Sequence, residues 1–198
     1  MFQGAQADST ILNKMADLNY NFEISKGFWA DLDIPKTKRG WKKLIEKYYF
    51  CAAMDKRNSF FIVRDSTELK YAQLVFDICE LSTRISRRNL DQFVTSINES
   101  VDKPVNGAIS LQYMTCLNDG KEFGREATHS LYVTVIGPHD EAEYQKFRSM
   151  IDELLQELEP YATSEEEIRR LISDKPDEGY KPATSYTDDF KKRGIIRY

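Results

Sequence analysis

Residues 107–158, GAISLQYMTCLNDGKEFGREATHSLYVTVIGPHDEAEYQKFRSMIDELLQEL, carry the most regular pattern in the chain. Apolar and polar side chains alternate over residues 108–115 and again over residues 129–136, as is typical of β-strands with one buried face. A charged loop separates the two segments. The pattern therefore predicts an antiparallel β-hairpin.

A helix is predicted directly after this hairpin. Gly137 and Pro138 end the second strand, and Asp140 with Glu143 forms an acidic version of the capping box. Apolar side chains then recur on one helical stripe, at Tyr144, Phe147, Ile151, Leu154 and Leu158. A helix with one apolar stripe needs a surface to cover, so we expect it to lie across the sheet.

The other segments show weaker signals of the same kinds. Cap residues and apolar spacing predict further helices, over residues 8–18, 37–52, 65–88, 89–101 and 163–172. The short apolar run SFFIVR at residues 59–64 predicts a buried strand. Residues 19–36 have no clean period and predict irregular structure or short strands.

This order of elements predicts an α+β fold, with a small, mostly antiparallel sheet covered by helices and an extended C-terminal arm. We expect one domain over residues 1–173 and the arm over residues 174–198, where Pro, Gly and Tyr become frequent. With 198 residues and 41% hydrophobic content, the chain can build an ordinary core.

Charge and cysteine usage limit the function classes. A net charge of −4 argues against a general phosphate-binding surface, because nonspecific nucleic-acid affinity comes mainly from Lys and Arg. Cys51, Cys79 and Cys116 are odd in number and lie in apolar contexts, which predicts buried thiols in a reducing compartment. The sequence shows neither a signal peptide nor an apolar run that could span a bilayer, so we expect a cytoplasmic protein or one assembled in a virion.

Residues that carry catalysis are sparse. His129, on the apolar face of the expected hairpin, and His139, at a helix start, lack the partners that nucleophilic or metal chemistry requires. The cysteines are too far apart for zinc, and no glycine-rich loop suits a nucleotide phosphate. Asp65, Glu68 and Lys70 could serve a metal-dependent nuclease, but a helix cap explains Asp65 and Glu68. We therefore expect no enzymatic activity, no catalytic or metal-binding residue and no cofactor.

Two groups of residues are candidates for binding a partner. Arg84, Arg87 and Arg88 form a candidate basic patch, although cations at the end of a helix also complement its dipole. In the arm, aromatic and branched side chains gain stability only when buried, which predicts anchors for a neighbouring subunit or for the chain's own domain. The partner-binding candidates in the arm are Tyr180, Tyr186, Phe190, Lys191, Lys192, Arg193, Ile195, Ile196 and Tyr198.

Residues 108–113, the polar loop through Glu126, residues 131–138 and the helix from Asp140 together resemble the core of tail-terminator and tail-completion proteins of long-tailed bacteriophages. The resemblance implies a hairpin that runs into a helix on the sheet, and a ring subunit that acts by contact rather than by catalysis.

We therefore expect a non-enzymatic assembly or interaction protein, of the tail-completion or connector type where the resemblance applies, that binds a protein partner or itself. A small inhibitor or immunity-type protein that blocks a partner protein is the alternative. A third hypothesis is a nucleic-acid-processing accessory factor, which the composition of the chain does not support. No contact with a membrane is expected.

Overall fold

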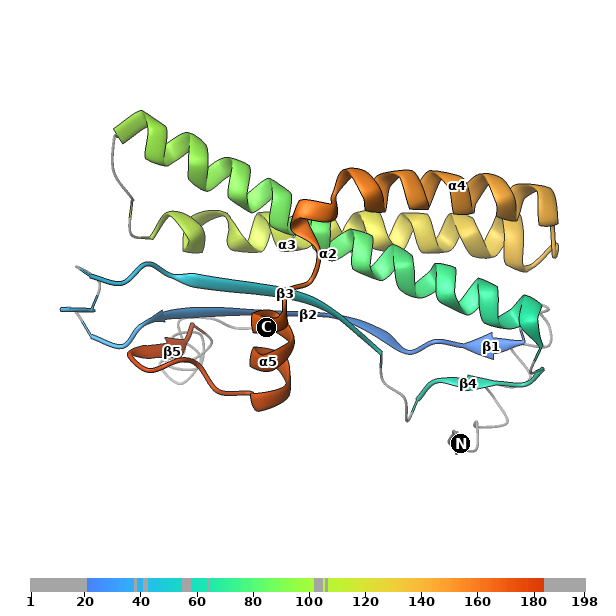
Figure 1. Cartoon of the computed structure of the whole chain (residues 1–198), viewed down its shortest axis with the longest axis horizontal. Helices are drawn as coiled ribbons and strands as arrows, with labels where there is room; N and C mark the ends of the chain where they lie inside the picture. The colour runs from blue at the N-terminus through green and yellow to red at the C-terminus, as the bar shows by residue number, and fades with distance from the viewer. Residues whose placement is uncertain are drawn as a thin grey trace, which may run out of the picture.

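The computed structural model describes residues 21–37, 39–40, 43–54, 58–63, 65–101, 105 and 107–183. Within these residues, two small antiparallel sheets are packed with four α-helices (Figure 1), which confirms the predicted α+β class. The helix predicted over residues 8–18 lies outside the described residues. None of the described helices is both long enough and apolar enough to cross a membrane.

The larger sheet has three strands in the order β3-β2-β5, and each neighbouring pair is antiparallel. These strands are β2 (Lys26–Pro35), β3 (Lys47–Met54) and β5 (Tyr180–Pro182). Because β2 is the central strand, one of its edges faces β3 and the other faces the much shorter β5. The smaller sheet joins β1 (Phe22–Glu23) to β4 (Phe60–Phe61).

The helices lie on both faces of the larger sheet. α2 (Ser66–Val101) and α3 (Ala108–Leu131) cover one face, and α3 continues into a π-helical turn, η2 (Tyr132–Ile136). α4 (Glu141–Glu157) packs on α2 and η2, on the side away from the sheet (Figure 1). The chain then crosses to the other face of the sheet, where α5 (Glu165–Ser173) lies.

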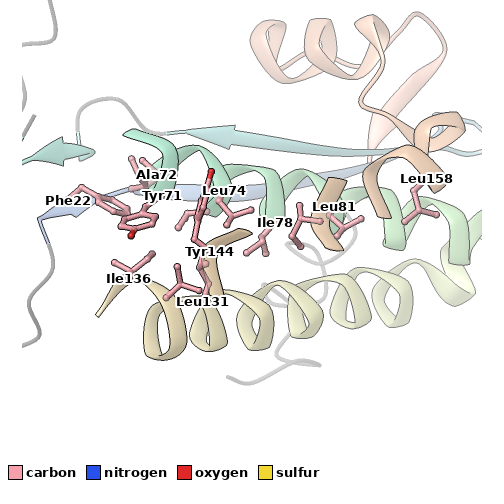
Figure 2. Close-up of a cluster of buried hydrophobic side chains, with 14 residues drawn as sticks. Phe22, Tyr71, Ala72, Leu74, Ile78, Leu81, Leu131, Ile136, Tyr144 and Leu158 are labelled. Atoms are coloured by element: carbon pink, nitrogen blue, oxygen red, sulfur yellow. The ribbon is translucent and has the colours of Figure 1, made fainter. Parts of the chain in front are cut away.

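The larger of two hydrophobic cores lies where α2, η2 and α4 meet β1. Figure 2 shows side chains from these elements converging on one volume. Its fully buried members include Phe22, Leu74, Ile78, Ile136 and Ile151. This core ties the first described strand to the helical layer, which places the start of β2 beside α2.

The second core lies between the larger sheet and the helices α2 and α3. Leu32 and Ile34 of β2 pack there with Phe50 of β3 and Ile109 of α3. The rings of Phe50 and Tyr113 stack at a centroid distance of 5.2 Å. Successive side chains of a strand point to opposite faces, so the even-numbered side chains of β2 face the helices and the odd-numbered ones face α5.

The predicted hairpin is wrong, because residues 108–136 form a continuous helical segment. Ile109, Tyr113 and Leu117 are buried at four-residue intervals, which is the spacing of a helix face. In the expected strand Leu111 would share their face, but it is 75% exposed. The alternating residues therefore fit two periods, and packing against the sheet selects the helical one.

Three further predictions are corrected. Residues 47–54 form strand β3 rather than the end of a helix, because both faces of this segment are covered, by the helices and by α5. Residues 66–101 form one long helix instead of two. The predicted strand at residues 59–64 is reduced to β4. The helix after Asp140 is confirmed together with its cap, although it covers α2 and η2 rather than the sheet.

Candidate interaction site

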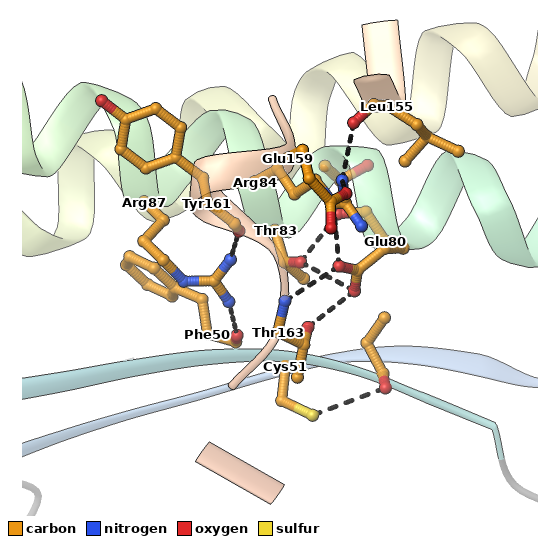
Figure 3. Close-up of polar contacts among 12 residues, drawn as sticks. Phe50, Cys51, Glu80, Thr83, Arg84, Arg87, Leu155, Glu159, Tyr161 and Thr163 are labelled. Carbon is orange, nitrogen blue, oxygen red and sulfur yellow. Dashed lines mark hydrogen bonds and ion pairs between the residues drawn. The ribbon is translucent and has the colours of Figure 1, made fainter. Parts of the chain in front are cut away.

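The outer edge of β3 is closed by side chains. The main-chain N–H of Phe50 donates to Glu167 Oε1 at 3.1 Å, and the Phe50 carbonyl accepts from Arg87. Arg87 also donates to the carbonyl of Tyr161, in the 3-10 turn η3 (Glu159–Tyr161), as Figure 3 shows. A carboxylate and a guanidinium thus satisfy the two groups that a neighbouring strand would pair with.

The candidate basic patch is not an exposed cluster. The Arg87 side chain is only 9% exposed and forms an ion pair with Glu167 at 2.8 Å. Arg84 pairs with Glu80 at 3.0 Å and donates to the Leu155 carbonyl at 2.7 Å (Figure 3). Arg88 contacts the side-chain oxygen of the adjacent Asn89. Arg84 and Arg87 therefore hold the connection between α4 and α5 to α2.

Among the described residues, the opposite edge of β2 is paired only at residues 32–35. β5 pairs only with residues 33–35, and Ala183 adds one further bond, from its N–H to the Leu32 carbonyl at 2.7 Å. Main-chain groups of every second residue face the same edge of a strand, so those of Ala30 and Phe28 face this edge too. No described residue pairs with them there. Burial of β2 follows the pairing at this edge. Residues 32–35, which lie opposite β5 and Ala183, are buried, and residues 28–31 are partly exposed.

A cleft of about 400 Å³ lies between this part of β2 and the C-terminal half of α3. Phe28 lines it from the sheet, and Cys79 and Ser82 line it from α2. Gly124 of α3 explains the close approach of α2 and α3 at this point, because a Cβ there would lie 2.3 Å from Ser82 Oγ. The open edge and the cleft together form a groove, which we call the β2 groove.

Basic side chains line the β2 groove, and one of them, Arg125, also pairs with Glu122 and Glu126 on α3. Lys121, Arg125 and His129 follow one another at four-residue intervals on α3 and line the cleft. The Lys26 amine donates to the Val75 carbonyl at 3.1 Å and to Thr128 Oγ1 at 2.5 Å.

Lys26 is the most enclosed of these basic side chains. Burial lowers the pKa of its amine below the ordinary value of 10.5. Among the described residues, no carboxylate forms an ion pair with Lys26 or Lys121. The β2 groove is therefore suited to an acidic group from outside the described residues.

A different ion-pair cluster fixes α5 to the sheet. The guanidinium of Arg170 donates to Asp33 Oδ2 at 2.9 Å and also reaches Asp31, both on the odd-numbered face of β2. The rings of Trp29 and Tyr49 flank the Arg170 guanidinium, with centroids 5.9 and 5.8 Å from it. Asp33 is fully buried, so the cluster anchors α5 and leaves that carboxylate no access to solvent.

The residues considered for catalysis have structural roles or none. Asp65 caps α2, because its Oδ1 accepts from the Glu68 N–H at 2.8 Å, which confirms the cap interpretation. Lys70 pairs with Glu141 at 2.5 Å. His139 has a positive φ of 56° just before the α4 cap. The sequence pattern predicts His129 on the apolar face of a hairpin. In the structure it lies exposed on α3 instead.

The three cysteines are buried, as predicted, and remain free thiols. Burial raises the pKa of Cys51 to about 11 and also raises the pKa of Cys79. A thiol needs to ionise to act as a nucleophile, so neither position favours nucleophilic chemistry. Within the described ranges, no group of three or more His, Cys, Asp or Glu side chains could hold a metal ion.

Of the partner-binding candidates in the arm, only Tyr180 lies in the described residues. It belongs to β5 and is 7% exposed, and its hydroxyl donates to the Ile45 carbonyl at 2.8 Å. The start of the arm is therefore docked on the chain's own sheet. The other candidates lie outside the described residues: Tyr186, Phe190, Lys191, Lys192, Arg193, Ile195, Ile196 and Tyr198.

Sequence reasoning missed the residues of the β2 groove. The sequence pattern predicts a loop for Lys121 and Arg125 and a strand for His129, and only a helix brings the three onto one face. Their four-residue spacing is visible in the sequence. It places them on one face only if the segment is helical. No sequence pattern indicates that Lys26 belongs to the site, because its role there depends on its burial in the fold.

No protein-family model matches this chain, and neither a curated protein nor a solved structure shows significant similarity to it. The function is therefore argued from the geometry of the site.

Proposed function

We propose that this protein is a non-enzymatic interaction protein that binds an extended peptide segment by adding it as a strand to the open edge of β2. The observation that carries the proposal is the pair of edge-facing residues Phe28 and Ala30, which lie beside a basic groove and have no described main-chain partner on that side. In strand addition, main-chain hydrogen bonds give affinity and pockets for alternate side chains give specificity.

The shape of the β2 groove defines the chemistry of the segment that fits it. Every second side chain of an added strand points toward α3, where Phe28 and Gly124 leave a largely apolar cleft. Basic side chains line this cleft, and Lys26 lies at the start of β2, where its amine donates to Thr128 of α3. The best ligand is therefore about six residues long, by the length of the open edge, with small or apolar side chains and a carboxylate at that end.

The narrower functions suggested by the sequence remain predictions. The resemblance to tail-completion proteins depended on a hairpin over residues 108–136, and this segment is helical. An inhibitor that blocks a partner protein would also act by contact. The nucleic-acid hypothesis loses support because Arg84 and Arg87 are engaged inside the fold.

Selection from a phage-displayed peptide library on the full chain tests the proposal. Ala30→Pro removes an N–H that faces the open edge and not β3, and proline is tolerated at such edge positions. Lys121→Glu with Arg125→Glu reverses the charge of the groove. Lys146→Glu on α4 is the matched control, because its side chain is exposed and pairs only with Glu143 among the described residues.

We expect selected peptides to carry an acidic residue near one end and to bind Ala30→Pro roughly tenfold more weakly, since at least one main-chain hydrogen bond is lost and the ring blocks approach. The double charge reversal should weaken binding in a salt-dependent way, and Lys146→Glu should leave it unchanged. Selected peptides that bind Ala30→Pro as well as the unmodified chain would show that the open edge is not the binding site.

A further inference from the structure

Two contacts join β2 to α3 along the cleft of the β2 groove. At one of them the Lys26 amine donates to Thr128 Oγ1 at 2.5 Å. At the other the Phe28 ring lies against α3, since a Cβ at Gly120 would lie 3.1 Å from Phe28 Cε1. Three residues that line the cleft from α3 lie between these contacts in the sequence: Lys121, Gly124 and Arg125. The contacts therefore mark out a short stretch of cleft, with Lys26 at one of its ends.

The Lys26 amine can bond to one more acceptor. An ammonium group carries three N–H donors. Two of them bond to uncharged groups, the Thr128 hydroxyl and the Val75 carbonyl, and no described residue accepts the third. A carboxylate at this position would form a charge-assisted hydrogen bond, which is roughly twice as strong as one between neutral groups.

We propose that the peptide segment bound by the β2 groove ends there, and that the Lys26 amine holds its free C-terminal carboxylate. The inference rests on the proposed function, because it takes the ligand to be a strand added to the edge of β2. An Asp or Glu side chain carries the same charge, but two features of the groove favour the chain terminus.

The first feature is the charge at the start of β2, which selects the direction of the ligand. Both described partners of β2 run antiparallel to it. An antiparallel ligand brings its C-terminal end to the start of β2, where Lys26 lies, whereas a parallel ligand brings its N-terminal end there. Basic side chains attract a carboxylate and repel an amino terminus, so the antiparallel direction is favoured.

The second feature is the contact between Lys26 and Thr128, which selects the last residue. Directly opposite residues of antiparallel strands point to the same face, so a ligand residue opposite Lys26 would point its side chain at this contact. A ligand whose last residue lies opposite Phe28 avoids it. That residue places its side chain in the cleft beside Phe28 and Gly124, and its carboxylate extends toward Lys26. The favoured ligand therefore has an apolar last residue and a free carboxyl group.

Two libraries of the same random hexapeptides test the proposal on the full chain. One displays free C termini, and in the other a carrier protein is fused to the C terminus. The tightest binder is then synthesised as the free acid, as the C-terminal amide and with one added glycine. The amide removes the charge, and the glycine moves the carboxylate about 3.4 Å along the strand.

Two variants identify the group that recognises the carboxylate. Lys26→Met removes the amine and keeps a long apolar side chain. Lys146→Met is the matched control, because Lys146 is exposed on α4 and pairs only with Glu143 among the described residues. The comparison of acid with amide on the unmodified chain does not depend on the folding of either variant.

We expect the binders to come from the library with free C termini and to end in an apolar residue. Amidation and the added glycine should each weaken binding roughly tenfold or more, because a hydrogen bond to a charged group is lost. In Lys26→Met the difference between acid and amide should largely disappear, whereas Lys146→Met should bind both forms as the unmodified chain does.

Equal binding of acid and amide by the unmodified chain would overturn the proposal. If Ala30→Pro still weakens those peptides, the proposed function stands without it. A preference for the acid that persists in full in folded Lys26→Met would assign the carboxylate to another cation and would also overturn the proposal. A failure of both libraries to yield a binder would instead overturn the proposed function, and this inference with it.

Discussion

Replacing Arg87 by alanine tests whether the closed edge of β3 depends on one buried ion pair. The Arg87 and Glu167 side chains are 9% and 7% exposed, with 2.8 Å between nitrogen and oxygen. Without the guanidinium, the Glu167 carboxylate stays buried with no cation, and the carbonyls of Phe50 and Tyr161 lose a donor. Removing one partner of a buried pair typically costs about 3 to 5 kcal/mol, so we expect a loss of that size in the free energy of unfolding.

Urea denaturation followed by circular dichroism measures the loss. Arg125→Ala is the control, because the Arg125 side chain is 66% exposed and its pair with Glu122 lies on the surface. Surface pairs contribute about 0 to 1 kcal/mol, so the control should stay close to the unmodified protein. The expected difference between the two variants is several times the error of the extrapolation to water.

A double-mutant cycle identifies the cause. Glu167→Gln keeps the size of the side chain and removes its charge, so no isolated carboxylate is left when Arg87 is also replaced. We expect the double variant to lose less than the sum of the single losses, with a coupling energy of about 0.5 to 3 kcal/mol. A loss for Arg87→Ala no larger than that of Arg125→Ala would refute the reasoning, and strictly additive losses would show that the carbonyl contacts alone matter.

Two further predictions concern helix packing and pH. Gly124→Ala should destabilise the protein by about 1 to 3 kcal/mol, because the new Cβ would lie 2.3 Å from Ser82 Oγ. Ser82→Ala removes that oxygen, so combining the two changes should recover part of the stability lost in thermal denaturation. Lys47→Met should destabilise the protein at neutral pH, and the difference between the two proteins in urea denaturation should shrink as the pH is lowered below 3.8. The hydrogen bond from Lys47 lowers the pKa of Asp177 below its ordinary value of 3.8, so the stabilisation is present above that value and is lost as the pH falls through the folded pKa.

Local signals in the sequence were sufficient for the helices that begin at strong caps. Asp140 caps α4 as predicted. For α5, Thr163 and Glu166 have the spacing of a capping box in the sequence, but Ser164 and Glu167, one residue later, form it. Both pairs have the required spacing, and the choice depends on a distant contact, because the Thr163 hydroxyl donates to Glu80 at 2.7 Å.

The sequence could not identify α3, because its residues suit a strand locally. Residues 132–136, YVTVI, are β-branched or aromatic, which favours a strand wherever packing allows one. Gly120 and Gly124 lie in the segment predicted as a charged loop, and in α3 they allow the helix to approach Ser82 and Ser86 of α2. The period of burial is a property of the assembled core, so it becomes visible only when the partner helix is in place.

The β2 groove could not be predicted for the same reason, because it forms only when segments distant in the chain pack together. Its main-chain groups carry no sequence signature, because any residue can present them at an edge. Its cations come from β2 and from α3, two elements about 100 residues apart in the chain, as the hydrogen bond from Lys26 to Thr128 illustrates. The predicted arm nevertheless includes the segment that borders the groove, since β5 pairs with residues 33–35 of β2.

The two edges of the sheet differ in a way that favours a binding role for β2. An exposed edge strand is a site for uncontrolled pairing, and proteins usually block it with charged side chains or covering elements. This chain blocks the β3 edge at Phe50 with the buried pair of Arg87 and Glu167. At the β2 edge basic side chains line a cleft beside the strand, and no described residue pairs with the main chain of Phe28 and Ala30 on that side. Under the proposed function this arrangement admits a strand and limits which one can enter, because β5 borders one end of the groove and the buried Lys26 amine at the other end favours a carboxylate.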